Sequence, residues 1–291
     1  MTHRIVRLAV LLLAFAPAVA AKDFEDRIAA KPGGRLRVDL KGGSVEVESH
    51  GDNEVRVDAN VRGMGSRSMD FDLEGDGVDV DFSADIRAWA SVFGRPQVRV
   101  RLRIPERYDV DIRTGGGDVD LEEIHGEVKA RTSGGSIKVD EIEGPVLLWT
   151  SGGSIEAKAI RGDLEARTSG GRIRAAEVTG SVEAHTSGGP IKVTDVQGAV
   201  DLHTSGGEIS VRFTDAPAGV LETSGGGIEV EFPEDVGASL DAKTSGGRVD
   251  VEHGIRVQGS QNPQHVVGEV NGGGRTLRLR TSGGDIRVRI R

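Results

Sequence analysis

Serine and glycine residues that recur together along the chain are the first candidates for chemistry. The stretch TSGGSI stands at 132–137 and again at 150–155. Serine becomes a nucleophile when a base and an orienting group lie beside it, and glycine-rich loops can cradle phosphate. No base keeps a fixed sequence spacing from these serines, and the G-x-S-x-G and G-x-x-x-x-G-K-[ST] motifs are absent. We therefore predict that the stretch is structural and that the protein is not an enzyme.

The residue before the threonine of each copy is a second candidate, because its type changes along the chain. Two of these residues are histidines, His185 and His203, and an acid stands two residues before each. Zn²⁺ takes such nitrogen and oxygen ligands, but no partner for the second ring nitrogen is evident, so we predict no metal and no cofactor. The acids at the turns are interpreted as a solvated row rather than a calcium site; they are Glu123, Glu141, Glu177 and Asp195.

The same position holds a tryptophan, Trp149, between two copies that carry arginine. An exposed tryptophan beside arginines is typical of interfaces, and its ring can also stack on a sugar. Both Trp149 and Leu147 are expected to point outward. We therefore predict a partner-binding surface row made of Arg131, Leu147, Trp149, Arg167, His185 and His203.

The elements that would hold these side chains follow from the spacing of the copies. Their threonines stand at 114, 132, 150, 168, 186 and 204, a spacing of 18 residues, and further copies begin at 223, 244 and 281. Apolar and polar residues alternate between the turns, as at Ile137 and Val139. Period-two alternation predicts strands with one buried face. An extra apolar residue such as Ile142 breaks the alternation, and this break predicts a corner.

Two short strands and two corners per unit predict an all-β, parallel β-solenoid with two sheets and about 18 residues per turn, right-handed by the crossover rule. The unit lacks the apolar residue at every sixth position of a hexapeptide β-helix, and it lacks the aspartate of calcium-binding nonapeptides. The threonine continues the inward phase, so we expect its hydroxyl to bond along a ladder of stacked threonines. The glycine pair is expected to supply backbone angles that include positive φ.

The chain divides into four predicted regions. Residues 1–20 are interpreted as a signal peptide, because positive residues precede a short apolar run and the Ala-Val-Ala at 18–20 fits a cleavage site. Residues 21–112 are expected to form irregular solenoid rungs and a cap, with the stretch 87–94 over the solenoid end. Residues 113–252 carry the regular 18-residue repeats. Residues 253–291 are expected to form a loop, over 253–274, and the final rung, whose last strand would end the solenoid.

Composition narrows the choice of partners. The 291 residues include 43 glycines, no cysteine and 3% aromatic residues, so the core must be aliphatic and free of disulfides. The net charge of −9 disfavours nucleic acid and simple attraction to an anionic membrane, because both need clustered Lys and Arg. The apolar run near the start is too short to predict a membrane span.

The stretch LRIPERYDVDIRTGGGDVDLEEIHGEVKARTSGGSI, residues 102–137, resembles a bacterial "putative adhesin" family, a domain of unknown function. The shared signature is an apolar strand, a proline, a second strand and T-x-G-G-[DS]-[IV] units separated by a glycine turn. The GGSVEV at 42–47 fits it too. The resemblance covers residues 33–291. It implies an exported, cell-envelope β-solenoid, and it carries no catalytic residues.

These features predict an exported protein, in the periplasm, on the cell surface or secreted, that acts as a non-enzymatic scaffold or adhesin-like binding module. Its partner would be a polysaccharide or an envelope protein. The alternative is an enzyme acting on envelope or extracellular glycans, a lyase or hydrolase on a β-helix, which would need a cleft with close carboxylates. A third possibility is pairing between solenoid ends through the strand at 285–291.

Overall fold

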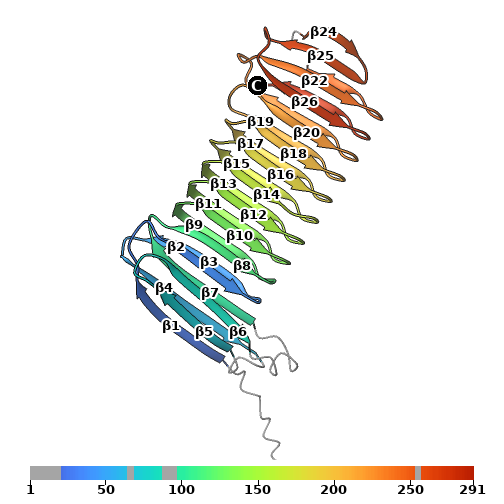
Figure 1. Ribbon diagram of the computed structural model, residues 1–291. Coiled ribbons are helices and arrows are strands. Elements are labelled where there is room, and N and C mark those ends of the chain that lie inside the picture. Colours follow the sequence, from blue (N-terminus) through green and yellow to red (C-terminus); the bar gives the residue numbers. More distant parts are fainter. Residues whose placement is uncertain (1–20, 64–68, 87–96, 253–256) are drawn as a thin grey trace, which may run out of the picture.

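The computed structural model describes residues 21–63, 69–86, 97–252 and 257–291, and every regular element in them is a β-strand. The strands form two long sheets that make up one elongated stack (Figure 1). Sheet A contains 13 strands and sheet B contains 14. Within the described residues, no helix is long and apolar enough to cross a membrane.

Both sheets run from the N-terminal end of the stack to the C-terminal end. In spatial order, sheet A consists of β1 (Ala21–Ala29), β4 (Glu54–Arg62), β7 (Gln97–Pro105), β3 (Ser44–His50), β9 (Val119–His125), β11 (Ile137–Glu143), β13 (Ile155–Arg161), β15 (Ile173–Val178), β17 (Ile191–Val196), β19 (Ile209–Phe213), β21 (Ile228–Phe232), β27 (Ile286–Ile290) and β23 (Val249–Val251). Sheet B consists of β5 (Met69–Gly75), β6 (Val80–Ile86), β2 (Arg35–Leu40), β8 (Asp109–Thr114), β10 (Val128–Thr132), β12 (Val146–Thr150), β14 (Leu164–Arg167), β16 (Val182–Thr186), β18 (Val200–Thr204), β20 (Gly219–Thr223), β26 (Arg275–Thr281), β22 (Ala238–Thr244), β25 (His265–Val270) and β24 (Val257–Asn262).

The regular part of the stack gives one strand to each sheet in every turn. Neighbouring turns pair in parallel, so Ile137 lies beside Ile155 in sheet A and Val128 lies beside Val146 in sheet B. The inward side chains of both sheets, such as Val139 and Leu148, are fully buried in one continuous aliphatic core. The predicted all-β, two-sheet parallel β-solenoid is therefore confirmed, and its right-handed winding stays a prediction.

The corner that breaks the alternation is made by one residue of unusual backbone conformation in each turn. These residues have φ between 52° and 58°; they are Glu123, Glu141, Ala159, Glu177 and Asp195. Residues other than glycine rarely adopt this left-handed conformation. It lets two buried positions, such as Val139 and Ile142, stand three residues apart in one strand. The parity break in the sequence therefore has a local backbone cause.

The threonine of TSGG ties each turn to the preceding one. Thr150 is buried, and its hydroxyl donates to the carbonyl oxygen of Gly135 in the preceding turn, 2.8 Å away. Thr132 bonds to the carbonyl of Gly117 in the same way over 2.9 Å. The predicted ladder of threonines bonded to one another is therefore wrong, because each hydroxyl takes a glycine carbonyl as its acceptor.

The second glycine of each TSGG pair is required by close approach between turns. A Cβ at Gly135 would lie 2.0 Å from the carbonyl oxygen of Gly117, whereas a Cβ at Gly134 would have its nearest neighbour 3.9 Å away. Neither Gly134 nor Gly135 has a positive φ. The prediction that this pair supplies positive φ is therefore wrong, because the constraint comes from the space between turns.

Irregular strands close the N-terminal end of the stack. Strands β1 and β4 pair antiparallel in sheet A, and β5 pairs antiparallel with β6 in sheet B. The rings of Phe24 and Phe71 stack with centroids 4.9 Å apart, and the Phe82 ring lies 6.3 Å from each. Phe82 is buried in the core, and the partly buried Phe24 and Phe71 pack against it. The stretch 87–94, predicted to cap it, and the predicted signal peptide at 1–20 lie outside the described residues.

The C-terminal end is not built in chain order. Strands β26 and β27 are the last in the chain, yet they lie between β20 and β22 in sheet B and between β21 and β23 in sheet A. The prediction that the last strand of the chain ends the solenoid is therefore wrong, because β27 pairs with β21 over residues 286–290 and with β23 over residues 286–288. The described part of 253–274 is a hairpin, β24 and β25, that pairs antiparallel with β22, which corrects the predicted loop.

Candidate binding groove

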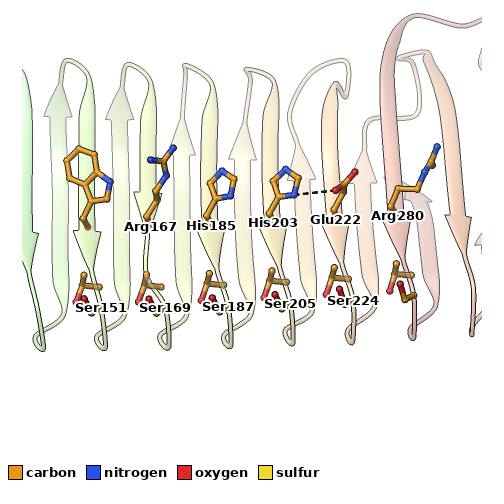
Figure 2. A pocket seen from close by; sticks show the side chains of 18 of the residues that line it. Ser151, Arg167, Ser169, His185, Ser187, His203, Ser205, Glu222, Ser224 and Arg280 are labelled. Carbon is orange, nitrogen blue, oxygen red and sulfur yellow. Dashed lines mark ion pairs between the residues drawn. The ribbon is translucent and has the colours of Figure 1, made fainter.

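The residue before each threonine lies on the outer face of sheet B, and the parallel register places these residues side by side. In spatial order from β10 to β22 they are Arg131, Trp149, Arg167, His185, His203, Glu222, Arg280 and Lys243. We call this line of eight residues the outer row. Figure 2 shows its members from Arg167 to Arg280 aligned across neighbouring strands.

A groove of about 1060 Å³ follows the outer row along the sheet. A second line of side chains runs along it, contributed by successive TSGG copies: Ser151, Ser169, Ser187, Ser205 and Ser224, which we call the serine wall (Figure 2). Ser282 and Ser245, from the copies at 281 and 244, also line the groove. The wall residues are exposed, and their hydroxyls make no hydrogen bond to another described residue. The groove therefore offers a regular line of hydroxyls opposite a line of larger, mostly nitrogen-bearing side chains.

The first two members of the outer row form a cation–π pair. The Arg131 guanidinium lies over the Trp149 ring, 4.3 Å from its centroid. Arg131 has no carboxylate partner among the described residues, whereas the Trp149 side chain is half-buried. The ring therefore holds a cation that no acid of the described chain neutralises.

The third member, Arg167, is neutralised by two acids, Glu165 and Glu183, that stand two residues before members of the outer row. The residues at this position of each strand form a neighbouring line on the same face of sheet B. Its guanidinium lies 2.5 Å from the Glu183 carboxylate and 3.0 Å from that of Glu165. The hydrogen bond to Glu183 raises the pKa of Arg167, and the same bond lowers the pKa of Glu183. Both charges are therefore held in place, and Arg167 has less capacity for an added anion than Arg131.

The centre of the row is a stacked histidine pair. The rings of His185 and His203 lie 5.0 Å apart with an interplanar angle of 4°. Each Nε2 faces an acid of its own strand, Glu183 at 3.1 Å and Asp201 at 2.5 Å, and His203 Nδ1 lies 3.5 Å from Glu222. The described residues contain no group of three or more His, Cys, Asp or Glu side chains that could hold a metal ion.

The far end of the row comes from the C-terminal turns. Arg280 pairs with Asp241, which also accepts a hydrogen bond from His265. These contacts hold the pKa of Asp241 below its usual range, and the hydrogen bond from Arg280 has the largest effect. Lys243, the last member, is exposed and has no carboxylate partner among the described residues. The two cations without acid partners, Arg131 and Lys243, therefore stand at opposite ends of the groove.

The structure brings together five of the six residues predicted for the partner surface. Leu147 is the exception: it is half-buried in the neighbouring line, between Lys129 and Glu165, and does not line the groove. The serine wall was not predicted from the sequence as part of the site, and neither were three members of the outer row, Glu222, Arg280 and Lys243. For these three row members a signal was present, because each precedes the threonine of a TSGG copy.

The fold and the groove together define the class of this protein: it is a parallel β-solenoid in which the same position of each repeat lines a groove on the outer face of one sheet. Residues 34–289 match the Toastrack DUF4097 family, and the chain belongs to that family. The family resemblance stated from the motifs is therefore confirmed. No curated protein matches the chain.

Solved structures that resemble the chain share little of its sequence. One is a putative cell adhesion protein from Clostridium sporogenes, 11% identical, covering 93% of this chain and 100% of that chain, with a TM-score of 0.24. A second is a putative adhesin from Bacteroides fragilis, 9% identical, covering 93% and 97%, with a TM-score of 0.35. A third is a putative lipid binding protein from Parabacteroides distasonis, 12% identical, covering 92% and 96%, with a TM-score of 0.41.

Proposed function

We propose that this protein is an exported, non-enzymatic β-solenoid of the cell envelope that binds an extended ligand, a polysaccharide or a protein, along the groove of sheet B. The observation that carries the proposal is the groove itself, which follows one repeated position across eight strands from β10 to β22. A ligand that is itself a linear repeat can meet the same kind of contact at every turn.

The side chains of the groove support binding rather than reaction. Trp149, the arginines and the histidines present aromatic and hydrogen-bonding surface, a composition found where proteins meet partners. Among the described residues, no side chain forms a hydrogen bond with the hydroxyls of the groove serines, and the Nε2 atoms of His185 and His203 face Glu183 and Asp201 instead. Leu147 stands on the same strand as Trp149 but outside the groove, and its half-buried side chain would extend the binding surface beyond the groove.

The binding proposal is tested with purified protein on a panel of immobilised neutral and acidic polysaccharides and envelope proteins. Trp149→Ala and His203→Ala remove groove side chains, and Arg174→Ala with Lys192→Ala removes exposed cations from sheet A as the control. Weaker binding by the groove variants alone supports the proposal. Unchanged binding by every groove variant contradicts it.

Export is tested separately by isolating the full chain from fractionated cells and measuring its mass. The proposal expects envelope or medium protein that begins at Ala21, because the Ala-Val-Ala at 18–20 precedes that residue. A chain that retains residues 1–20 and stays in the cytoplasm overturns this part.

A further inference from the structure

We propose that the ligand of the groove is a linear acidic polysaccharide, whose carboxylate or sulfate groups contact Arg131 and Lys243 while its hydroxyls contact the serine wall. This inference rests on the proposed function, since it names the chemistry of the ligand for the same groove.

The charge of the groove selects an anionic ligand. Four cations line it, Arg131, Arg167, Arg280 and Lys243, against one carboxylate, that of Glu222. Arg167 and Arg280 already hold acids, so the charge open to a ligand is that of Arg131 and Lys243. Unpaired cations beside a groove attract anions and cost no ion pair when they bind one.

The position of the Arg131 guanidinium argues against a neutral sugar stacked on Trp149. The guanidinium lies 4.3 Å from the centroid of the indole and covers one face of the ring. A sugar could use that face only after displacing the cation and losing the cation–π contact. An anionic group, in contrast, can bind the guanidinium where it already lies, because the ring restricts its motion.

The length of the groove selects a linear polymer. Arg131 on β10 and Lys243 on β22 are separated by seven strand spacings of sheet B, and at about 4.8 Å each this is about 34 Å. A small anion cannot reach both cations, whereas one chain can bind both and place a hydroxyl near each serine between them. Joining two weak contacts on one chain raises affinity through effective concentration, so binding should tighten with chain length.

The surroundings of the groove disfavour a densely charged polymer. Glu165, Glu183 and Asp201 stand side by side along the neighbouring line of residues. Duplex DNA carries one charge per about 1.7 Å, and these three acids, of which Glu165 and Glu183 share a single arginine, would repel the phosphates that lie beside them. Single-stranded nucleic acid stacks its bases on open aromatic faces, and the one tryptophan that lines the groove has one of its two faces covered by Arg131. A polysaccharide with charges spread among neutral hydroxyls fits better.

The test measures binding of polygalacturonate fragments of increasing length by calorimetry, with a neutral glucan and oligo-dT of equal length as comparators. The groove variant is Arg131→Gln with Lys243→Gln. The matched control is Arg174→Gln with Lys192→Gln, which removes the same charge from exposed sheet A residues that also lack acid partners among the described residues. None of the four residues forms an ion pair whose loss would disturb the described structure, and circular dichroism checks that each variant folds.

We expect affinity for polygalacturonate to rise with length until the fragment spans about 34 Å and then to level off. The groove variant should bind the long fragment about tenfold more weakly, since an exposed ion pair is worth up to about fivefold per site. The control should lose less than about twofold.

Four outcomes overturn the inference. If the control loses as much as the groove variant, the attraction is non-specific. If oligo-dT binds as tightly as polygalacturonate, the ligand class is wrong. If a neutral glucan or a protein binds and Trp149→Ala weakens it while the double glutamine variant does not, the proposed function stands and the acidic class falls. If no tested ligand responds to any groove variant, both proposals fall.

Discussion

Substitution by alanine should have different effects on stability at the two glycines of one TSGG copy. Gly135→Ala places a Cβ 2.0 Å from the Gly117 carbonyl oxygen, whereas Gly134→Ala places one 3.9 Å from its nearest neighbour. Unbonded heavy atoms settle at about 3.5 Å, so the turn holding Gly135 must move by about 1.5 Å. Gly134→Ala needs no movement.

The free-energy cost of that movement has two parts. Overpacking that shifts backbone costs about 1–3 kcal/mol. The shift also strains the hydrogen bond from the Thr132 hydroxyl to the Gly117 carbonyl, 2.9 Å in the structure, and a buried group left without its partner costs about 1–3 kcal/mol. Gly135→Ala should therefore destabilise by about 2–6 kcal/mol. Gly134→Ala should have a free energy of unfolding within about 1 kcal/mol of that of the natural protein.

The assay is urea unfolding followed by far-UV circular dichroism, with midpoints compared at equal slope. A lower midpoint for Gly135→Ala alone supports close approach between turns as the reason for the glycine. Equal midpoints for the two variants would refute the reasoning, because they would show that the turns can separate at no cost. Gly153→Ala, whose Cβ would lie 1.9 Å from the Gly135 carbonyl oxygen, repeats the test one turn further on.

Three further predictions concern stability. Thr150→Val keeps the shape of the side chain but leaves the Gly135 carbonyl without its donor, so the free energy of unfolding should fall by about 1–2 kcal/mol. In the same urea assay, the control Ser151→Ala should leave the free energy of unfolding unchanged. The pKa of Asp241 is lowered in the folded chain, first by the Arg280 hydrogen bond, so its stabilisation is present above the unfolded pKa of about 3.9 and is lost as pH falls through the folded value. The midpoint difference between the natural protein and Asp241→Asn should therefore shrink between pH 7 and pH 3, and a constant difference contradicts the assignment. Phe71→Ala removes one of three stacked rings at the N-terminal end and should lower the free energy of unfolding by about 2 kcal/mol, less than the loss of a fully buried ring would. An unchanged urea midpoint would show that these rings do not stabilise this end.

The regular turns could be predicted because their information is local. Alternation of period two marks each strand, and the constant spacing of the TSGG copies sets which residues stack. Even the corner was visible as a parity break, although the residue that makes it, such as Glu141 with φ of 57°, carried no sign of its conformation. Stacking alone therefore accounts for most of the fold.

The order of the C-terminal turns could not be predicted in the same way, because two strands with the same sequence pattern could each pair with the last regular turn. The TSGG copies at 244 and 281 carry the same pattern, and either could stack on the copy at 223. The structure places Thr281 beside Thr223 and Thr244 beyond it. The row residues from Arg131 to His203 could therefore be predicted from the sequence, whereas Arg280 and Lys243 could not, because their neighbours depend on that exchange of order.

The side-chain contacts within the groove could not be predicted from the alternation of apolar and polar residues either. Alternation predicted that Trp149 points outward, but it says nothing of which neighbour its ring meets. The guanidinium of Arg131 covers that ring, while the next arginine along, Arg167, turns to Glu183. Two arginines in equivalent positions therefore differ in their capacity for an anion, and only the side-chain contacts separate them.

The central claim, that a ligand lies in the groove of sheet B, is tested most directly by the fluorescence of Trp149. The chain has two tryptophans, so Trp89→Phe leaves Trp149 as the sole reporter. Titration with long polygalacturonate should change the Trp149 emission saturably, and Arg131→Gln should weaken that response. Polymer that is captured by the protein in a pull-down while the Trp149 emission stays unchanged at saturation would contradict the claim.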